Sequence, residues 1–140
     1  MAAFARDVLA RLPQKTAGAT ILALSGELGA GKTTFVQQVG RELGVAHVIQ
    51  SPTYVLVKTH HVPRGRFAKL VHIDLYRLEK PEELAPLKLE KIFTDSKALV
   101  CIEWPERGEG GLPEPDVTLR FSSHGANERE RYIEGHEGEE

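Results

Sequence analysis

Apolar residues recur at helical spacing in two stretches of the chain, which places their side chains on one face of each predicted helix. Pro13 ends the first stretch and Gly44 closes the second. A third helix is indicated by Pro81 and the two glutamates that follow it, because proline and acidic residues favour a first helical turn. Pro86 is expected to disturb that helix early. The predicted helices cover residues 4–12, 32–43 and 81–93.

Short continuous runs of aliphatic residues, typical of buried strands, alternate with these helices. Pro63 and Gly65 lie between the second and third runs, so a hairpin is predicted there. Strands that alternate with helices predict an α/β fold, with a mostly parallel central sheet, helices on its faces and some antiparallel strands. The predicted strands are 20–24, a strand beginning at 54–57, 67–74, 98–102, 117–121 and 131–133.

Length and charge narrow the class of protein without deciding its function. The 140 residues suit one domain, which we expect to span residues 1–140, with an acidic tail from about residue 134 that frays. Eighteen Lys and Arg against twenty Asp and Glu exclude a protein that binds nucleic acid through bulk positive charge. The single cysteine excludes an internal disulfide framework, and no apolar run is long enough to span a bilayer. We therefore expect a cytoplasmic protein without membrane association.

Residues 26–33 read GELGAGKT, which fits the phosphate-binding loop pattern G-x-x-x-x-G-K-[ST] in full. A predicted strand precedes this segment and a predicted helix follows it, as the motif requires. Glycines allow successive N–H groups to point at phosphate oxygens, and the helix N-terminus adds the positive end of its dipole. Lys32 is expected to reach the β- and γ-phosphates, and the Thr33 hydroxyl to bind Mg²⁺. The motif predicts a nucleotide site.

Two further predicted strands end in a carboxylate, at Asp74 and at Glu103. Hydrolysis of a nucleotide needs acidic groups beside the phosphate loop, to hold Mg²⁺ and to orient water. Either carboxylate could serve either role, and the residues alone leave the two roles exchangeable. Guanine specificity is poorly supported, because the chain lacks both an N-K-x-D and a D-x-x-G pattern. A small P-loop kinase, or a module that binds ATP only as a structural ligand, remains an alternative to an ATPase.

The motifs taken together resemble the TsaE (YjeE) family of bacterial ATPases of tRNA threonylcarbamoyladenosine biosynthesis. The motifs occur in the family's order, whereas Lys88 departs from a position where the family usually has glycine. The matching stretches are SGELGAGKTTFVQ at 25–37, SPTY at 51–54, HIDLYRL at 72–78, PEEL at 81–84, IEWPE at 102–106 and LPEPD at 112–116.

The resemblance implies a single P-loop NTPase-like domain that binds ATP with Mg²⁺ and hydrolyses ATP weakly. It also implies two partner subunits, TsaB and TsaD, which act on adenosine 37 of tRNAs that read codons beginning with A. This chain would not transfer the threonylcarbamoyl group itself. It would meet tRNA through the complex, and direct contact with tRNA is left open.

Roles for individual residues also follow from the resemblance. Lys32, Asp74 and Glu103 are the candidate catalytic residues, and Thr53 resembles a switch threonine that senses the γ-phosphate, although a simple Ser-Pro turn is the alternative. The candidate metal ligands are Thr33, Glu103 and Asp74. The residues implied to bind the nucleotide are Gly29, Ala30, Gly31, Lys32, Thr33, Thr34 and Thr53.

Several residues keep two interpretations. Trp104 lies either near the site or in ordinary packing, and His72 is either part of the site or a core histidine. The adenine-binding residues are the hardest to identify, and the basic stretch from residue 58 to residue 69 suits either RNA phosphates, an acidic partner or solvent. The candidates for the adenine pocket are Lys15, Thr16, Arg129 and Arg131.

Overall fold

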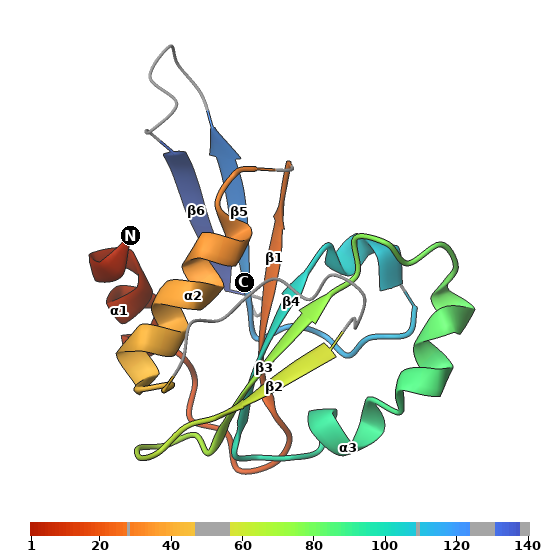
Figure 1. Ribbon diagram of the computed structural model, residues 1–140, viewed down its shortest axis with the longest axis horizontal. Helices are drawn as coiled ribbons and strands as arrows, with labels where there is room; N and C mark the ends of the chain where they lie inside the picture. The colour runs from red at the N-terminus through yellow and green to blue at the C-terminus, as the bar shows by residue number, and fades with distance from the viewer. Residues whose placement is uncertain (28, 47–56, 109, 124–130, 138–140) are drawn as a thin grey trace.

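The computed structural model describes residues 1–27, 29–46, 57–108, 110–123 and 131–137. Six strands form one sheet in the order β2-β3-β4-β1-β5-β6 (Figure 1). The four inner strands run parallel, and β2 and β6 are antiparallel at the two edges. The predicted α/β class with a mostly parallel sheet is therefore confirmed. The strands are β1 (Thr20–Gly26), β2 (Val57–His61), β3 (Lys69–Asp74), β4 (Ala98–Glu103), β5 (Val117–Ser123) and β6 (Arg131–Glu137).

Helices cover both faces of the sheet (Figure 1). Side chains alternate across a strand, so Leu99 and Cys101 of β4 join one apolar core with α1 and α2, whereas Val100 and Ile102 join a second core on the η1 and α3 face. None of the helices in the described part of the chain has the length and apolar character needed to span a bilayer. The helical elements are α1 (Ala2–Ala10), α2 (Lys32–Leu43), the 3₁₀ helix η1 (Pro81–Leu87), α3 (Glu90–Phe93) and the 3₁₀ helix η2 (Pro105–Gly108).

Strand register brings the candidate carboxylates to the phosphate loop. Asp74 at the end of β3 pairs with Glu103 at the end of β4, and Glu103 pairs with Leu24 of β1. Leu24 lies two residues before Gly26, where β1 ends. The carboxyl ends of three parallel strands therefore meet at one edge, which is where ligands bind in open α/β sheets.

The third predicted helix is interrupted, whereas the first two agree with α1 and α2 to within two residues. Instead of one helix over 81–93, the chain forms η1 and then the short α3. Pro86 lies inside η1 and cannot donate a backbone hydrogen bond, and Lys88 ends η1 in the left-handed region at φ 52° and ψ 52°. These two residues stop the α-helix from continuing.

The tail predicted to fray from about residue 134 is partly structured, because β6 continues beyond the predicted 131–133 to Glu137 and pairs with β5. Strand limits also differ modestly from the prediction at the β2–β3 hairpin. β2 begins at Val57, and residues 54–56 of the strand predicted there lie outside the described residues. β3 begins at Lys69 instead of residue 67, because the backbone N–H of Ala68 already bonds to the carbonyl of Lys97 in the turn before β4. The antiparallel pairing of β2 with β3 confirms the predicted hairpin.

Replacing Lys88 with glycine is expected to stabilise the protein. A non-glycine residue in the left-handed region costs about 1 kcal/mol, and glycine removes this cost at the price of a more flexible unfolded chain. The net gain in the free energy of unfolding should be about 0.5 kcal/mol, measured by urea denaturation. Lys91→Gly in α3 is the matched control and should lose stability. Equal losses in both variants would contradict the strain at Lys88.

Candidate functional site

The loop between β1 and α2 adopts a conformation that requires glycine. Gly26, Gly29 and Gly31 have φ values of 136°, 80° and 111°, all in the region that other residues rarely adopt. Gly31 is the N-cap of α2, and no side chain of the described residues caps this helix. The first N–H groups of α2 therefore point out of the helix end, an arrangement that suits an anion such as phosphate.

Lys32 is 4% exposed and lies across the inside of this loop. Its Nζ donates hydrogen bonds to the carbonyl oxygens of Gly26 and Glu27 and lies 4.2 Å from the centre of the Trp104 ring. Burial lowers the pKa of Lys32 below its ordinary value, and the negative charge of Glu103 is the largest of the effects that oppose this shift. The ammonium group is thus held by the partial negative charges of the loop carbonyl oxygens.

Thr33 and Glu103 are brought together from α2 and β4. The Thr33 hydroxyl donates to Oε2 of Glu103 at 2.9 Å and lies 3.2 Å from Oε1. Glu103 is 3% exposed, and its Oε2 also lies 2.6 Å from Nε2 of the fully buried His72 on β3. A carboxylate from the end of one strand therefore lies directly at the first turn of the helix that follows the phosphate loop.

Asp74 lies beside this group at the end of β3. It is half-buried, and its Oδ1 accepts a hydrogen bond from the backbone N–H of Tyr76 at 3.0 Å. Strand pairing places it directly across from Glu103, and its charge acts on Lys32. The structure thus brings together all three candidate metal ligands, Thr33, Asp74 and Glu103, at one edge of the sheet.

The donor set in this group fits Mg²⁺. A hydroxyl and carboxylate oxygens are the ligands that Mg²⁺ prefers, and this ion usually takes only one or two carboxylates and completes its shell with water and phosphate. Among the described residues, no group of three or more His, Cys, Asp and Glu side chains is arranged to hold a metal ion by itself. A hydroxyl with one or two carboxylates is the partial set of protein ligands that Mg²⁺ takes when water and phosphate complete its shell.

Trp104, Tyr76 and Arg107 form a stack beside Lys32. The rings of Tyr76 and Trp104 are 5.1 Å apart, and the Arg107 guanidinium lies 5.6 Å and 5.7 Å from their respective centres. Trp104 adopts φ 59°, a left-handed conformation that is costly for a residue of this size. Of the two interpretations of Trp104, the structure supports the one that places it at the site. Arg107 was not foreseen, and its place directly after the IEWPE motif is the signal that could have indicated it.

Other predicted nucleotide-binding residues are distributed along the same loop. Ala30 is buried, whereas Gly29 and Thr34 are exposed and Gly31 is half-buried. Thr53, together with the rest of the SPTY stretch, lies outside the described residues.

The four candidates for the adenine pocket gain little support. Lys15 donates to the carbonyl of Ala19 at 2.8 Å and to Oδ2 of Asp116 at 3.1 Å, and the same Oδ2 accepts the backbone N–H of Ile21. These contacts tie the connector before β1 to the start of β5, a structural role. Thr16 is exposed, Arg129 lies outside the described residues, and the side chain of Arg131 is not described.

The basic stretch from residue 58 to residue 69 is partly engaged within the protein. Lys69 forms an ion pair with Asp95 at 2.8 Å, and this hydrogen bond lowers the pKa of the Asp95 carboxyl. Arg66 donates to the carbonyl of Pro13, and His60 is buried. Lys58 and His61 remain exposed on β2. The stretch is therefore less of a continuous basic surface than its composition predicts.

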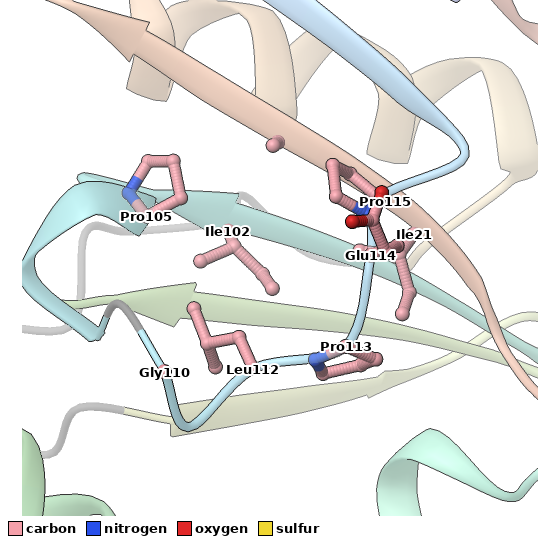
Figure 2. Close-up of a pocket in the computed structure, with 9 residues that line it drawn as sticks. Ile21, Ile102, Pro105, Gly110, Leu112, Pro113, Glu114 and Pro115 are labelled. Atoms are coloured by element: carbon pink, nitrogen blue, oxygen red, sulfur yellow. The ribbon is translucent and has the colours of Figure 1, made fainter. Parts of the chain in front are cut away.

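A pocket of about 200 Å³ lies on the η1 and α3 face of the sheet, opposite α2 (Figure 2). Ile21 of β1 and Ile102 of β4 form its floor, and Leu112 and Pro113 from the loop before β5 lie across it, as Figure 2 shows. None of the described residues of the phosphate loop lines this pocket. It is separate from the group around Lys32 and Thr33.

Known proteins are similar to this chain over most of its length. Residues 1–133 match the family model described as "Threonylcarbamoyl adenosine biosynthesis protein TsaE". A protein of Haemophilus influenzae named tRNA threonylcarbamoyladenosine biosynthesis protein TsaE is 43% identical over 107 residues, which cover 76% of this chain and 65% of that protein. A protein of Streptomyces coelicolor with the same name is 37% identical over 117 residues, covering 83% of this chain and 77% of that protein.

A further relative of this name, from a Nostoc species, is 46% identical over 95 residues, which cover 66% of this chain and 56% of the relative. The chain thus spans between about half and two thirds of the length of two of these relatives. The crystal structure of YdiB from Bacillus subtilis superimposes with a TM-score of 0.68 at 26% identity, covering 94% of this chain and 74% of YdiB.

Proposed function

Because the chain belongs to the TsaE family, we propose that it binds and hydrolyses ATP as an accessory protein in threonylcarbamoyl modification of tRNA. The modified position would be adenosine 37 of tRNAs that read codons beginning with A. One observation carries the proposal: the Thr33 hydroxyl that ends the phosphate-loop motif lies 2.9 Å from the Glu103 carboxylate of a neighbouring strand. A bare glycine turn between a strand and a helix does not require this contact.

Within this proposal, each residue of the loop has a distinct task. The backbone N–H groups of residues 29–34 bind the phosphates, and Lys32 exchanges its carbonyl partners for phosphate oxygens, which offer a full negative charge. Thr33 and Glu103 would hold Mg²⁺, with Asp74 either completing the shell or orienting water, and the ion would supply positive charge that neutralises the phosphates. Thr53 is proposed to sense the γ-phosphate.

The partner subunits are proposed to be TsaB and TsaD, with tRNA approaching through their complex. Residues 1–140 would act as a single domain. In keeping with the family resemblance, the protein would not transfer the threonylcarbamoyl group itself. The proposed role of ATP is to drive a conformational step in the partners.

The first test is Mg²⁺-dependent ATP hydrolysis by the purified protein, alone and with a TsaB–TsaD pair, with Lys32→Ala as the blank. Slow hydrolysis that depends on Lys32 and changes when the pair is added supports the proposal. Hydrolysis with no response to the pair argues against partner coupling. Phosphate that moves from ATP to a small molecule instead of water identifies the alternative, a small P-loop kinase.

Glu103→Gln is expected to lower Mg²⁺-dependent ATP hydrolysis by about 100-fold, because an amide is a much poorer ligand for a hard cation than a carboxylate. Binding of ATP in EDTA should change little. Glu106→Gln is the matched control: this acid acts on Lys32 through its charge, but it is exposed on η2, whereas Glu103 is the carboxylate that accepts the Thr33 hydrogen bond. Hydrolysis is measured across a Mg²⁺ titration. Equal effects of the two substitutions would contradict the assignment of Glu103.

A further inference from the structure

His72 is buried at a position where an apolar residue would serve the fold better. It lies on the face of β3 that also carries Leu70, and its partner in the register is Cys101; both neighbours belong to the apolar core under α2. The imidazole is 0% exposed. Burying a polar ring costs free energy unless its nitrogens are hydrogen-bonded, so a histidine here calls for an explanation.

Only one of its two ring nitrogens has a partner among the described residues. Nε2 lies 2.6 Å from Oε2 of Glu103, whereas no hydrogen-bond partner of Nδ1 lies within the described part of the chain. A carboxylate oxygen only accepts, so Nε2 carries the hydrogen and donates it. In the neutral imidazole, this tautomer leaves Nδ1 with a lone pair instead of an orphan N–H. The ring is therefore oriented by the Glu103 contact.

From this geometry we propose that His72 is a positioning residue, which fixes the Glu103 carboxylate for Mg²⁺ binding; the inference rests on the proposed function. Oε2 receives two hydrogen bonds, from Thr33 on α2 and from His72 on β3. Thr33 is itself a candidate ligand, whereas His72 is not. His72 can therefore hold Oε2 in place while Thr33 and Glu103 present their oxygens to the ion. Such outer partners are commonly worth about 10–100-fold in metal affinity.

Three substitutions separate positioning from packing. His72→Leu removes the donor and keeps an apolar core residue. His72→Gln places an amide N–H near the position of Nε2, whereas the shorter side chain of His72→Asn reaches only as far as Nδ1. Cys101→Ala, at the paired position on β4, is the control for altered packing without loss of a donor.

The experiment measures ADP binding by calorimetry, first in EDTA and then across a Mg²⁺ titration, with thermal unfolding to confirm that each variant folds. His72→Leu and His72→Asn should raise the Mg²⁺ concentration at half-effect by about 10–100-fold, with ADP affinity in EDTA within about twofold of the wild type. His72→Gln should recover most of this loss, and Cys101→Ala should resemble the wild type.

The comparison between Gln and Asn keeps the test decisive even if His72→Leu does not fold. Equal Mg²⁺ dependence in the wild type and both polar variants would overturn the positioning role while leaving the proposed function intact. If Cys101→Ala lost as much Mg²⁺ affinity as His72→Asn, packing would account for the effect and the inference would fall. Wild-type protein that binds ADP with no response to Mg²⁺ would instead overturn the proposed function, and this inference with it.

Discussion

Lys32→Met is expected to reduce ATP hydrolysis by at least about 100-fold while leaving the protein folded, because the substitution removes the cation that we propose to bind the β- and γ-phosphates and keeps a side chain of similar length. Lys32 is 4% exposed, and its ammonium group contacts two backbone carbonyls and the Trp104 ring. Methionine fills this space without a charge that must be desolvated. In this variant, ATP hydrolysis should therefore fall while the free energy of unfolding rises.

The gain in stability should depend on pH in a direction set by the lowered pKa of Lys32. The unfolded chain has the ordinary pKa of 10.5, and burial lowers the folded value. Between the two values the unfolded state binds more protons, so wild-type stability rises with pH there. The cost of the buried charge is full below the folded pKa and disappears above 10.5. The gain in the free energy of unfolding from Lys32→Met should shrink as the pH rises from the folded pKa of Lys32 to its unfolded pKa.

Urea denaturation of both proteins between neutral pH and pH about 10.5 measures this difference, and a phosphate-release assay measures hydrolysis. Lys15→Met is the matched control, since Lys15 is partly exposed and paired with Asp116 and should lose stability when replaced. A Lys32→Met variant that is less stable than the wild type at every pH would contradict the idea that the buried charge of Lys32 lowers the stability of the protein and is kept for nucleotide binding.

Gly26→Ala is expected to destabilise the protein by about 4 kcal/mol or more, enough to unfold a domain of this size. A Cβ at this position would lie 2.1 Å from the carbonyl oxygen of Phe121 on β5, and the φ of 136° is strained for alanine. The Cβ is bonded directly to the β1 backbone and the oxygen belongs to the β5 backbone, so the two atoms cannot separate without disrupting the pairing of these inner strands. The first glycine of the motif is thus required for the packing of β1 against β5.

Gly29→Ala provides the contrast within the same loop. Gly29 also has a left-handed φ, of 80°, but no atom of the described residues lies within 4 Å of a Cβ built there. Its replacement should cost only about 1–2 kcal/mol of backbone strain. Urea denaturation of the two variants separates the cost of the contact with Phe121 from the cost of the left-handed backbone. If Gly26→Ala lost no more stability than Gly29→Ala, the close approach of Phe121 would be ruled out as the reason for Gly26.

Local patterns predicted the parts of the site that lie close together in sequence. The phosphate loop, its strand and its helix follow from residues 20–44 alone, because glycine spacing and periodicity are local signals. The carboxylates at Asp74 and Glu103 were also found, since each ends an aliphatic run. Which of them contacts Thr33 depended on strand order and register, which no local pattern contains.

The features that the sequence did not predict depend on backbone conformation or on contacts between residues that are distant in sequence. Pro86 was expected to disturb the third helix, but the complete break after residue 87 also depends on the left-handed backbone of Lys88, a conformation that a lysine in the sequence does not indicate. Arg107 becomes noticeable only through its contacts with Tyr76 and Trp104. His72 is ambiguous in sequence because a core histidine and a histidine that holds a carboxylate look the same until its partner, 31 positions away, is known. Thr53 stays a prediction.

The strand order also sets when the site can first exist during synthesis. β1 carries the phosphate loop, yet its two neighbours in the sheet, β4 and β5, are made last among the inner strands. Thr33 and Glu103 are 70 positions apart, so at about 5–20 residues per second a ribosome needs several seconds to pass from one to the other. A nascent chain that ends between Thr33 and Glu103 contains the nucleotide motif but lacks the β4 carboxylate that contacts its threonine. The phosphate loop is translated early, and the site around Thr33 can form only after β4 has been made.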